Sequence, residues 1–237
     1  MKLICANFKM NLLKKDIWNY LDVIDGKIKK ENVIFFPNNL HIEYFKNKNY
    51  LVGSQDISFK DFGSITGDTS VLQLKEFGIT HTIIGHSERR KYFNDSNYID
   101  KKINLALSND IKVILCIGEN LEEKESNKTL EILKKELDFA ISNNLEYITE
   151  DNLIIAYEPI WSIGTNVIPT NLELFNTIKD IKDYLKNTYN LNLKVLYGGS
   201  VNKNNISLLE KVNNIDGYLI GGASLNPLSL LEIVSKL

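Results

Sequence analysis

Eight short runs of apolar and β-branched residues recur along the 237-residue chain, and their spacing leaves few folds open to it. Each run is continuous rather than alternating, which predicts parallel strands covered on both faces. The average interval of about 30 residues matches one strand with its crossover helix. The runs lie at residues 3–6, 33–36, 51–52, 82–84, 113–117, 153–157, 195–197 and 218–220.

The intervals between the runs carry helix signals. Apolar residues three or four apart mark residues 130–140 and 172–185 most clearly. Together with the strands they predict an α/β fold, a closed (β/α)8 barrel of eight parallel strands with outer helices. No linker divides the chain, so we expect one domain over residues 1–237. An open doubly wound sheet is the alternative, but no G-x-G-x-x-G motif follows the first run.

Charge and hydropathy exclude several classes of protein. The 28 basic and 30 acidic residues balance almost completely, which disfavours a nucleic-acid or membrane-surface partner. No run approaches the ~20 apolar residues of a membrane-spanning helix. Asn7 and Lys9 interrupt the apolar start of the chain, so it lacks the pattern of a secretory signal. We therefore expect a cytoplasmic protein without a membrane or nucleic-acid partner.

The two cysteines predict buried thiols rather than a disulfide. Cys5 and Cys116 lie within apolar runs, far apart in the sequence. With histidines only at positions 41, 81 and 86, these residues provide no metal-binding spacing. We expect neither a metal nor a cofactor.

Polar residues follow several of the apolar runs. In a barrel of this kind the loops after the strands form the active face. Asn7 and Lys9 follow the first run, His86 and Glu88 the fourth, and Glu158 the sixth. The Ser-Glu pair after the histidine indicates a helix N-terminus, whose positive end favours a neutral imidazole. A lone histidine is also typical of a buried structural residue, and a lone lysine of a solvated surface.

Two glycine pairs follow the last two runs. Gly198 and Gly199 precede Ser200, and Gly221 and Gly222 follow the eighth run. One such pair can be a simple tight turn, but two at these loops favour phosphate binding by backbone N–H groups. With the carboxylate, imidazole and ammonium, they predict proton abstraction next to a carbonyl in a small phosphorylated sugar.

Six motifs then occur in order along the chain. They are Asn-Phe-Lys-Met-Asn at 7–11, Gly-His-Ser-Glu-Arg-Arg at 85–90, Cys-Ile-Gly-Glu at 116–119, Tyr-Glu-Pro-Ile-Trp-Ser-Ile-Gly-Thr at 157–165, Tyr-Gly-Gly-Ser at 197–200 and Gly-Gly-Ala-Ser-Leu at 221–225. In them the chain resembles the triosephosphate isomerase family over essentially its whole length. The resemblance implies a TIM barrel that interconverts dihydroxyacetone phosphate and glyceraldehyde 3-phosphate through an enediol(ate), in glycolysis and gluconeogenesis.

The resemblance also implies a role for each candidate residue. Glu158 is the general base, and neutral His86 moves protons at the two oxygens. Lys9 supplies positive charge, is oriented by Asn7 and pairs with Glu88. The phosphate lies on the backbone N–H groups of Gly164, Ser200, Gly221 and Gly222.

Residues 159–170 correspond to the family's lid over the substrate, with Trp161 as a hinge anchor. Asn166 replaces a second lid glycine, which we expect to be a mild change because asparagine tolerates positive φ. Pro169 replaces a residue whose N–H the family's tyrosine, here Tyr197, accepts. Proline has no N–H, so we expect this latch to be absent and the C-terminal hinge to be stiffer. Phe8 replaces a more usual tryptophan, which packing should accommodate.

The resemblance further implies a homodimer, formed by inserting the loop around Thr66 into a partner subunit. Asp68 replaces the usual glutamate of that loop, and its shorter side chain reduces its reach towards Arg89 of the partner. We still expect a homodimer, because Thr66 and the residues before it match the family.

The sequence disfavours two other functions. One is that of another phosphate-binding barrel enzyme, such as a different sugar-phosphate isomerase or an aldolase. An aldolase would need a Schiff-base lysine inside a strand, and no run has one centrally placed. A catalytically silent scaffold would be indicated by loss of Glu158, His86 or Lys9, and all three are present.

Overall fold

The structure, a computed structural model, describes residues 2–165 and 167–237, and its strands close into one barrel in the order of the sequence. Every neighbouring pair is parallel, including the pair of the first and last strands. The predicted (β/α)8 barrel is confirmed, and the open doubly wound sheet is wrong. The strands are β1 (Leu3–Asn7), β2 (Val33–Phe36), β3 (Leu51–Ser54), β4 (His81–Ile84), β5 (Lys112–Ile117), β6 (Leu153–Tyr157), β7 (Lys194–Tyr197) and β8 (Gly217–Ile220).

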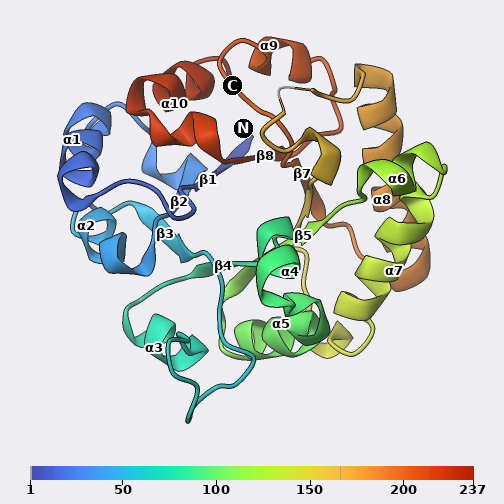
Figure 1. Cartoon of the computed structure of the whole chain (residues 1–237), viewed down its shortest axis with the longest axis horizontal. Helices are drawn as coiled ribbons and strands as arrows, with labels where there is room; N and C mark the ends of the chain where they lie inside the picture. Colours follow the sequence, from blue (N-terminus) through green and yellow to red (C-terminus); the bar gives the residue numbers. More distant parts are fainter. Residues whose placement is uncertain (1, 166) are drawn as a thin grey trace.

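Helices surround the strands, which lie towards the centre of the ring (Figure 1). Those in the described part of the chain are α1 (Lys14–Ile24), α2 (Ile42–Lys46), α3 (Val71–Glu76), α4 (Ser87–Phe93), α5 (Ile99–Ser108), α6 (Leu121–Glu125), α7 (Thr129–Ile141), α8 (Asn171–Tyr189), α9 (Ile206–Leu209) and α10 (Pro227–Val234). Across residues 2–165 and 167–237, no helix combines the length and apolar character needed to cross a membrane.

The sequence pattern located the elements closely. The runs at 33–36 and 153–157 coincide with β2 and β6, and the other six strands extend one or two residues beyond their runs. The helical patterns at 130–140 and 172–185 lie within α7 and α8. The start of α8 is fixed by a capping box, in which Thr170 accepts a hydrogen bond from Glu173 N–H and Glu173 accepts one from Thr170 N–H. This cap also sets where the segment after β6 rejoins the helical layer.

The core has two parts. A small cluster of inward-facing residues fills the barrel, and a larger one lies between the strands and the helices. Cys5 and Cys116 belong to the inner cluster as free, buried thiols, as expected, and burial raises the pKa of Cys5. Phe8 is fully buried, with its ring centroid 5.0 Å from that of Tyr20 and 5.6 Å from that of Phe45. The smaller ring is thus accommodated by aromatic packing.

Candidate active site

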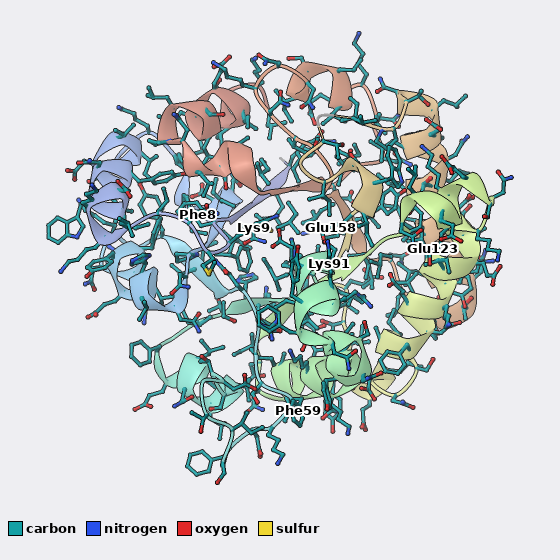
Figure 2. The ribbon with its side chains drawn as sticks, viewed as in Figure 1. Phe8, Lys9, Phe59, Lys91, Glu123 and Glu158 are labelled. Carbon is teal, nitrogen blue, oxygen red and sulfur yellow. The ribbon has the colours of Figure 1, made fainter. Side chains whose placement is uncertain are left out.

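A cavity of about 490 Å³ opens at the carboxyl ends of the strands. Lys9 and Glu158 lie near the centre of the ring of elements (Figure 2). Parallel strands bring the residues that follow them to one end of the barrel, so distant parts of the chain meet here. Eight of the candidate residues line this cavity: Asn7, Lys9, His86, Glu158, Gly164, Ser200, Gly221 and Gly222.

Lys9 is held in a left-handed backbone conformation just after β1, with φ of 51°. Such a conformation is unfavourable for a residue with a side chain and persists only where the surroundings impose it. Here Asn7 Oδ1 accepts the Lys9 N–H at 3.0 Å, and Gln55 Nε2 donates to the Lys9 carbonyl at 2.8 Å. The backbone N–H and carbonyl of Lys9 are therefore both held by hydrogen bonds, and the Lys9 side chain lines the cavity. Sequence reasoning missed Gln55, whose one signal is its place after the third run.

Glu88 reaches the site through Lys9. Lys9 Nζ lies 2.7 Å from Glu88 Oε1, and Glu88 itself is not among the residues that line the cavity. The Glu88 side chain is 45% exposed, so this ion pair is open to water and can be exchanged for other partners of the ammonium.

His86 caps the N-terminus of α4, as the sequence predicts. Its Nδ1 accepts the backbone N–H of Glu88 at 3.2 Å, so a neutral imidazole in this position carries its hydrogen on Nε2. That nitrogen lies 3.4 Å from Glu158 Oε1. The helix start therefore fixes which face of the ring meets the carboxylate.

Glu158 follows β6 directly and is 3% exposed. Its backbone N–H donates to the Ile117 carbonyl at 2.8 Å, which extends the ladder with β5 by one residue. The facing Gly198 leaves room for the side chain, because a Cβ there would lie 2.7 Å from Glu158 Cγ. A carboxylate, an imidazole N–H and an ammonium thus share one cavity.

The candidate phosphate-binding residues come from three separate loops. Gly164 follows η5 (Ile160–Ser162), Ser200 follows β7, and Gly221 leads into η6 (Gly222–Leu225) after β8. The Ser200 hydroxyl donates to the Ser162 carbonyl at 2.6 Å, which ties the first two loops together. All three loops contribute to the wall of the same cavity.

Trp161 is held from two sides at the start of the segment 159–170. Its Nε1 donates to Glu119 Oε1 at 2.9 Å, and Lys124 Nζ lies 3.5 Å from the centroid of its ring. Tyr157 Oη donates to the same Glu119 oxygen at 3.2 Å, and burial raises the pKa of Glu119. The motif contained Glu119, but sequence reasoning assigned it no role. Asn166, expected to be a mild change, lies outside the described residues.

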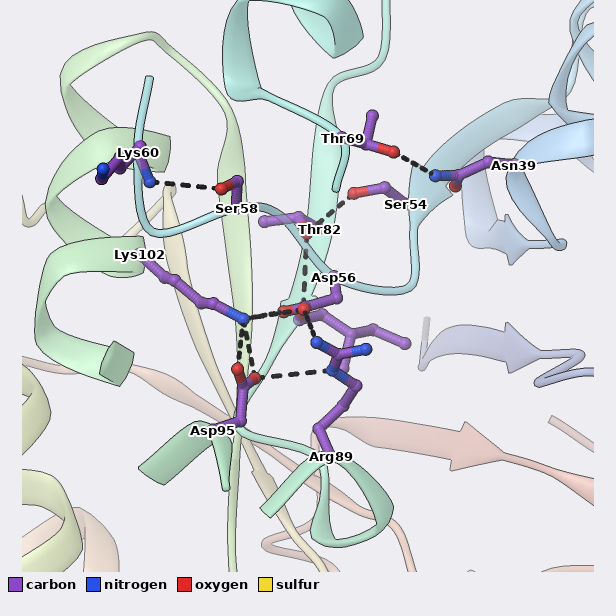
Figure 3. A network of polar contacts seen from close by, with 11 residues as sticks. Asn39, Ser54, Asp56, Ser58, Lys60, Thr69, Thr82, Arg89, Asp95 and Lys102 are labelled. Carbon is purple, nitrogen blue, oxygen red and sulfur yellow. Dashed lines mark hydrogen bonds and ion pairs between the residues drawn. The ribbon is translucent and has the colours of Figure 1, made fainter. Parts of the chain in front are cut away.

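Arg89, which the resemblance places within reach of Asp68 of a partner subunit, forms ion pairs within its own chain (Figure 3). Its Nη2 lies 2.8 Å from Asp56 Oδ2. The buried Lys102 lies 2.7 Å from both Asp56 and Asp95. These four side chains form a charged network, and Asp56 and Arg89 line one cavity with Gly67 and Asp68 of the loop 58–70.

Similarity to known proteins extends over nearly the whole chain. The family model described as triosephosphate isomerase matches residues 2–237. The triosephosphate isomerases of Finegoldia magna and Thermodesulfovibrio yellowstonii are 37% and 36% identical, each covering 98% of this chain and 97% and 98% of their own lengths. That of Saccharomyces cerevisiae is 35% identical over 98% of this chain and 96% of its own.

Proposed function

The chain belongs to the triosephosphate isomerase family, and we propose that Glu158, His86 and Lys9 carry out the family's reaction at the mouth of its barrel. The enzyme interconverts dihydroxyacetone phosphate and glyceraldehyde 3-phosphate, a step of glycolysis. The reaction moves a proton between adjacent carbons through an enediol(ate). The observation that carries the assignment of residues is the 3.4 Å separation of His86 Nε2 and Glu158 Oε1 in a cavity that also holds Lys9.

Glu158 is the general base in this proposal. Its carboxylate removes a proton from the carbon next to the carbonyl of dihydroxyacetone phosphate and returns it to the adjacent carbon. His86 Nε2–H donates to the substrate oxygens as negative charge develops on them. The hydrogen bond from the backbone of Glu88 to Nδ1 supports this assignment, because it leaves the hydrogen of a neutral imidazole on the side of the carboxylate.

Lys9 provides the positive charge. Its ammonium stabilises the enediolate oxygen and the phosphate, and Asn7 contributes by accepting the Lys9 backbone N–H. Glu88 holds the ammonium when the site contains no substrate. The substrate phosphate binds to backbone N–H groups of four residues, which we assign as Gly164, Ser200, Gly221 and Gly222.

The segment 159–170 acts as a lid in this proposal. Excluding water strengthens the interactions between the charged groups and the enediolate, and it protects an intermediate that can otherwise lose phosphate. Trp161, fixed between Glu119 and Lys124, supports a hinge at the beginning of this segment.

A coupled assay with each triose phosphate as substrate tests the proposed function. We expect turnover in both directions, with exchange of solvent deuterium into the carbon that is deprotonated. Failure to turn over either triose phosphate would overturn the proposal. Turnover of both, together with loss of activity when Glu158 is altered, would support it.

The proposal extends to assembly and location. We infer one catalytic domain over residues 1–237 in a cytoplasmic homodimer. The loop 58–70 supports the dimer, because it projects beyond the ring and Phe62 within it is 79% exposed (Figure 1). A partner subunit would cover the aromatic side chain of Phe62. Thr66 and Asp68 are exposed on the same loop and available for the contact.

A further inference from the structure

The hydroxyl of Ser162, the last residue of η5, is at the centre of three hydrogen bonds. Its Oγ lies 2.6 Å from the carbonyl oxygen of Val167, 3.1 Å from Tyr197 Oη and 3.3 Å from the backbone nitrogen of Ser200. Ser162 is completely buried. A hydroxyl has one hydrogen and two lone pairs, so these three bonds use its whole capacity.

The chemistry of the partners fixes the direction of each bond. The Val167 carbonyl can only accept, so it receives the hydrogen of Ser162. The Ser200 N–H can only donate. The remaining lone pair of Ser162 therefore accepts the hydroxyl hydrogen of Tyr197.

The proposed lid, residues 159–170, has a first arm before Gly164 and a second arm after it. Ser162 lies in the first arm and Val167 in the second, while Tyr197 is the last residue of β7. The hydrogen bonds of Ser162 therefore join both arms to β7 and the loop after it. Gly199 permits the contact, because a Cβ there would lie 2.3 Å from Tyr197 Oη and 2.7 Å from Ser162 Oγ. Pro169, further along the second arm, has no N–H to offer Tyr197.

We propose that Ser162 is a positioning residue for the reaction, and that its hydroxyl is the latch of the lid in this chain. The inference rests on the proposed isomerase function. The latch holds the second arm of the lid against the loop after β7, in the arrangement in which Gly164 lines the cavity. The bond from Ser200 is the longest of the three, so its N–H can pass to a substrate phosphate while the other two bonds remain.

A loosened lid has a specific chemical consequence. The enediolate can break its C–O bond to phosphate, so that inorganic phosphate leaves with the bonding electrons. The remaining enol becomes methylglyoxal, without any change in overall oxidation state. The fraction of turnovers that ends in this elimination therefore reports how well the lid is held, independently of how much folded enzyme is present.

Ser162→Ala tests the proposal, with Ser54→Ala as the matched control. Ser54 in β3 is also completely buried, and its hydroxyl donates to Thr82 Oγ1 at 2.8 Å in the barrel wall. For Ser162→Ala we expect kcat to fall about tenfold, the methylglyoxal fraction to rise about tenfold and KM to change much less. For Ser54→Ala we expect the methylglyoxal fraction of the wild type. Should Ser162→Ala fail to fold, Ser162→Cys keeps an atom at the same place with weaker hydrogen bonds and should change the fraction in the same direction.

The outcomes separate the two proposals. If the wild type turns over triose phosphates and neither Ser162 variant alters the methylglyoxal fraction, the latch is wrong and the isomerase function stands. An equal rise in Ser54→Ala would also overturn the latch, because the effect would then follow from any lost buried hydroxyl. A wild type without isomerase activity would instead refute the proposed function.

Discussion

Glu158 illustrates how closely single residues define this site. Its carboxylate is buried, meets His86 Nε2 at 3.4 Å, and packs against the space left by Gly198. A group confined in this way cannot follow a substrate atom if its own side chain is shortened. Positioning, rather than the presence of a carboxylate, should therefore control the rate.

Replacing Glu158 with aspartate moves the base by one methylene. We expect kcat to fall at least about 100-fold, because displacement by ~1 Å can cost that much, while KM changes far less. The same substitution at Glu131, exposed on the outside of α7, is the control and should keep wild-type kinetics. Turnover of Glu158→Asp at the wild-type rate would show that another residue is the base.

Tyr197 contacts the segment 159–170 through Ser162. It cannot accept an N–H from Pro169, and in the structure it donates to Ser162 instead. For Tyr197→Phe we expect kcat to fall less than tenfold, or about 1.4 kcal/mol, because Ser162 keeps its bond to Val167.

A double variant of Tyr197→Phe and Ser162→Ala tests whether the two hydroxyl groups act as one unit. Steady-state kinetics should show the double variant to be no slower than Ser162→Ala, because both substitutions disrupt one hydrogen-bonded unit. A loss in Tyr197→Phe alone of more than tenfold would mean that Tyr197 has a further partner in catalysis.

At the level of elements, the charged network connects the segment after β3 with α4, η3 (Asp95–Tyr98) and α5. Burial, together with neighbouring Asp95, raises the pKa of Asp56 from 3.8 to about 6, although Lys102 and Arg89 oppose the shift. The folded protein therefore keeps a proton on Asp56 over a pH range in which the unfolded chain has released it. Raising the pH through this range should lower the contribution of Asp56 to stability.

Asp56→Asn removes this titration while keeping the shape of the side chain. We expect the free energy of unfolding of the wild type, minus that of Asp56→Asn, to fall by about 2 kcal/mol between pH 4 and pH 7. Denaturant titrations of both proteins at one protein concentration measure it. A difference that rises with pH would mean that the ion pairs with Lys102 and Arg89 outweigh burial and that the pKa is lowered.

At the level of the whole molecule, the projecting loop 58–70 and the charged network next to it are the features that bear on the proposed dimer. Arg89 already has a partner in Asp56, so a dimer need not depend on an ion pair between Asp68 and the Arg89 of a second subunit. The exposed Phe62 offers apolar area that such a contact would bury.

Sedimentation in dilute solution should give a mass of twice 27.1 kDa. Phe62→Glu should shift the population towards monomer, since burying the carboxylate in an interface is costly. Leu228→Glu, at a 65% exposed apolar position on α10, is the control and should leave the mass unchanged. A wild type that is monomeric and fully active would contradict the proposed dimer.

Much of this molecule could be predicted before its contacts were known. The continuous apolar runs indicated parallel strands, and strand ends were located to within two residues, because run length is a local property of the chain. The end of each run also indicated which side chains face the mouth of a closed barrel. For this reason Lys9, His86 and Glu158 were identified as candidates from their positions alone, and the cavity contains all three.

The partners of those residues could not be predicted in the same way. Gln55 lies 46 residues from Lys9, Ser162 lies 35 from Tyr197, and Arg89 in α4 pairs with Asp56 after β3. A periodic pattern contains no distances between loops. Such distances follow from the register and closure of the barrel and from side-chain rotamers, and these depend on the packing of the whole chain at once.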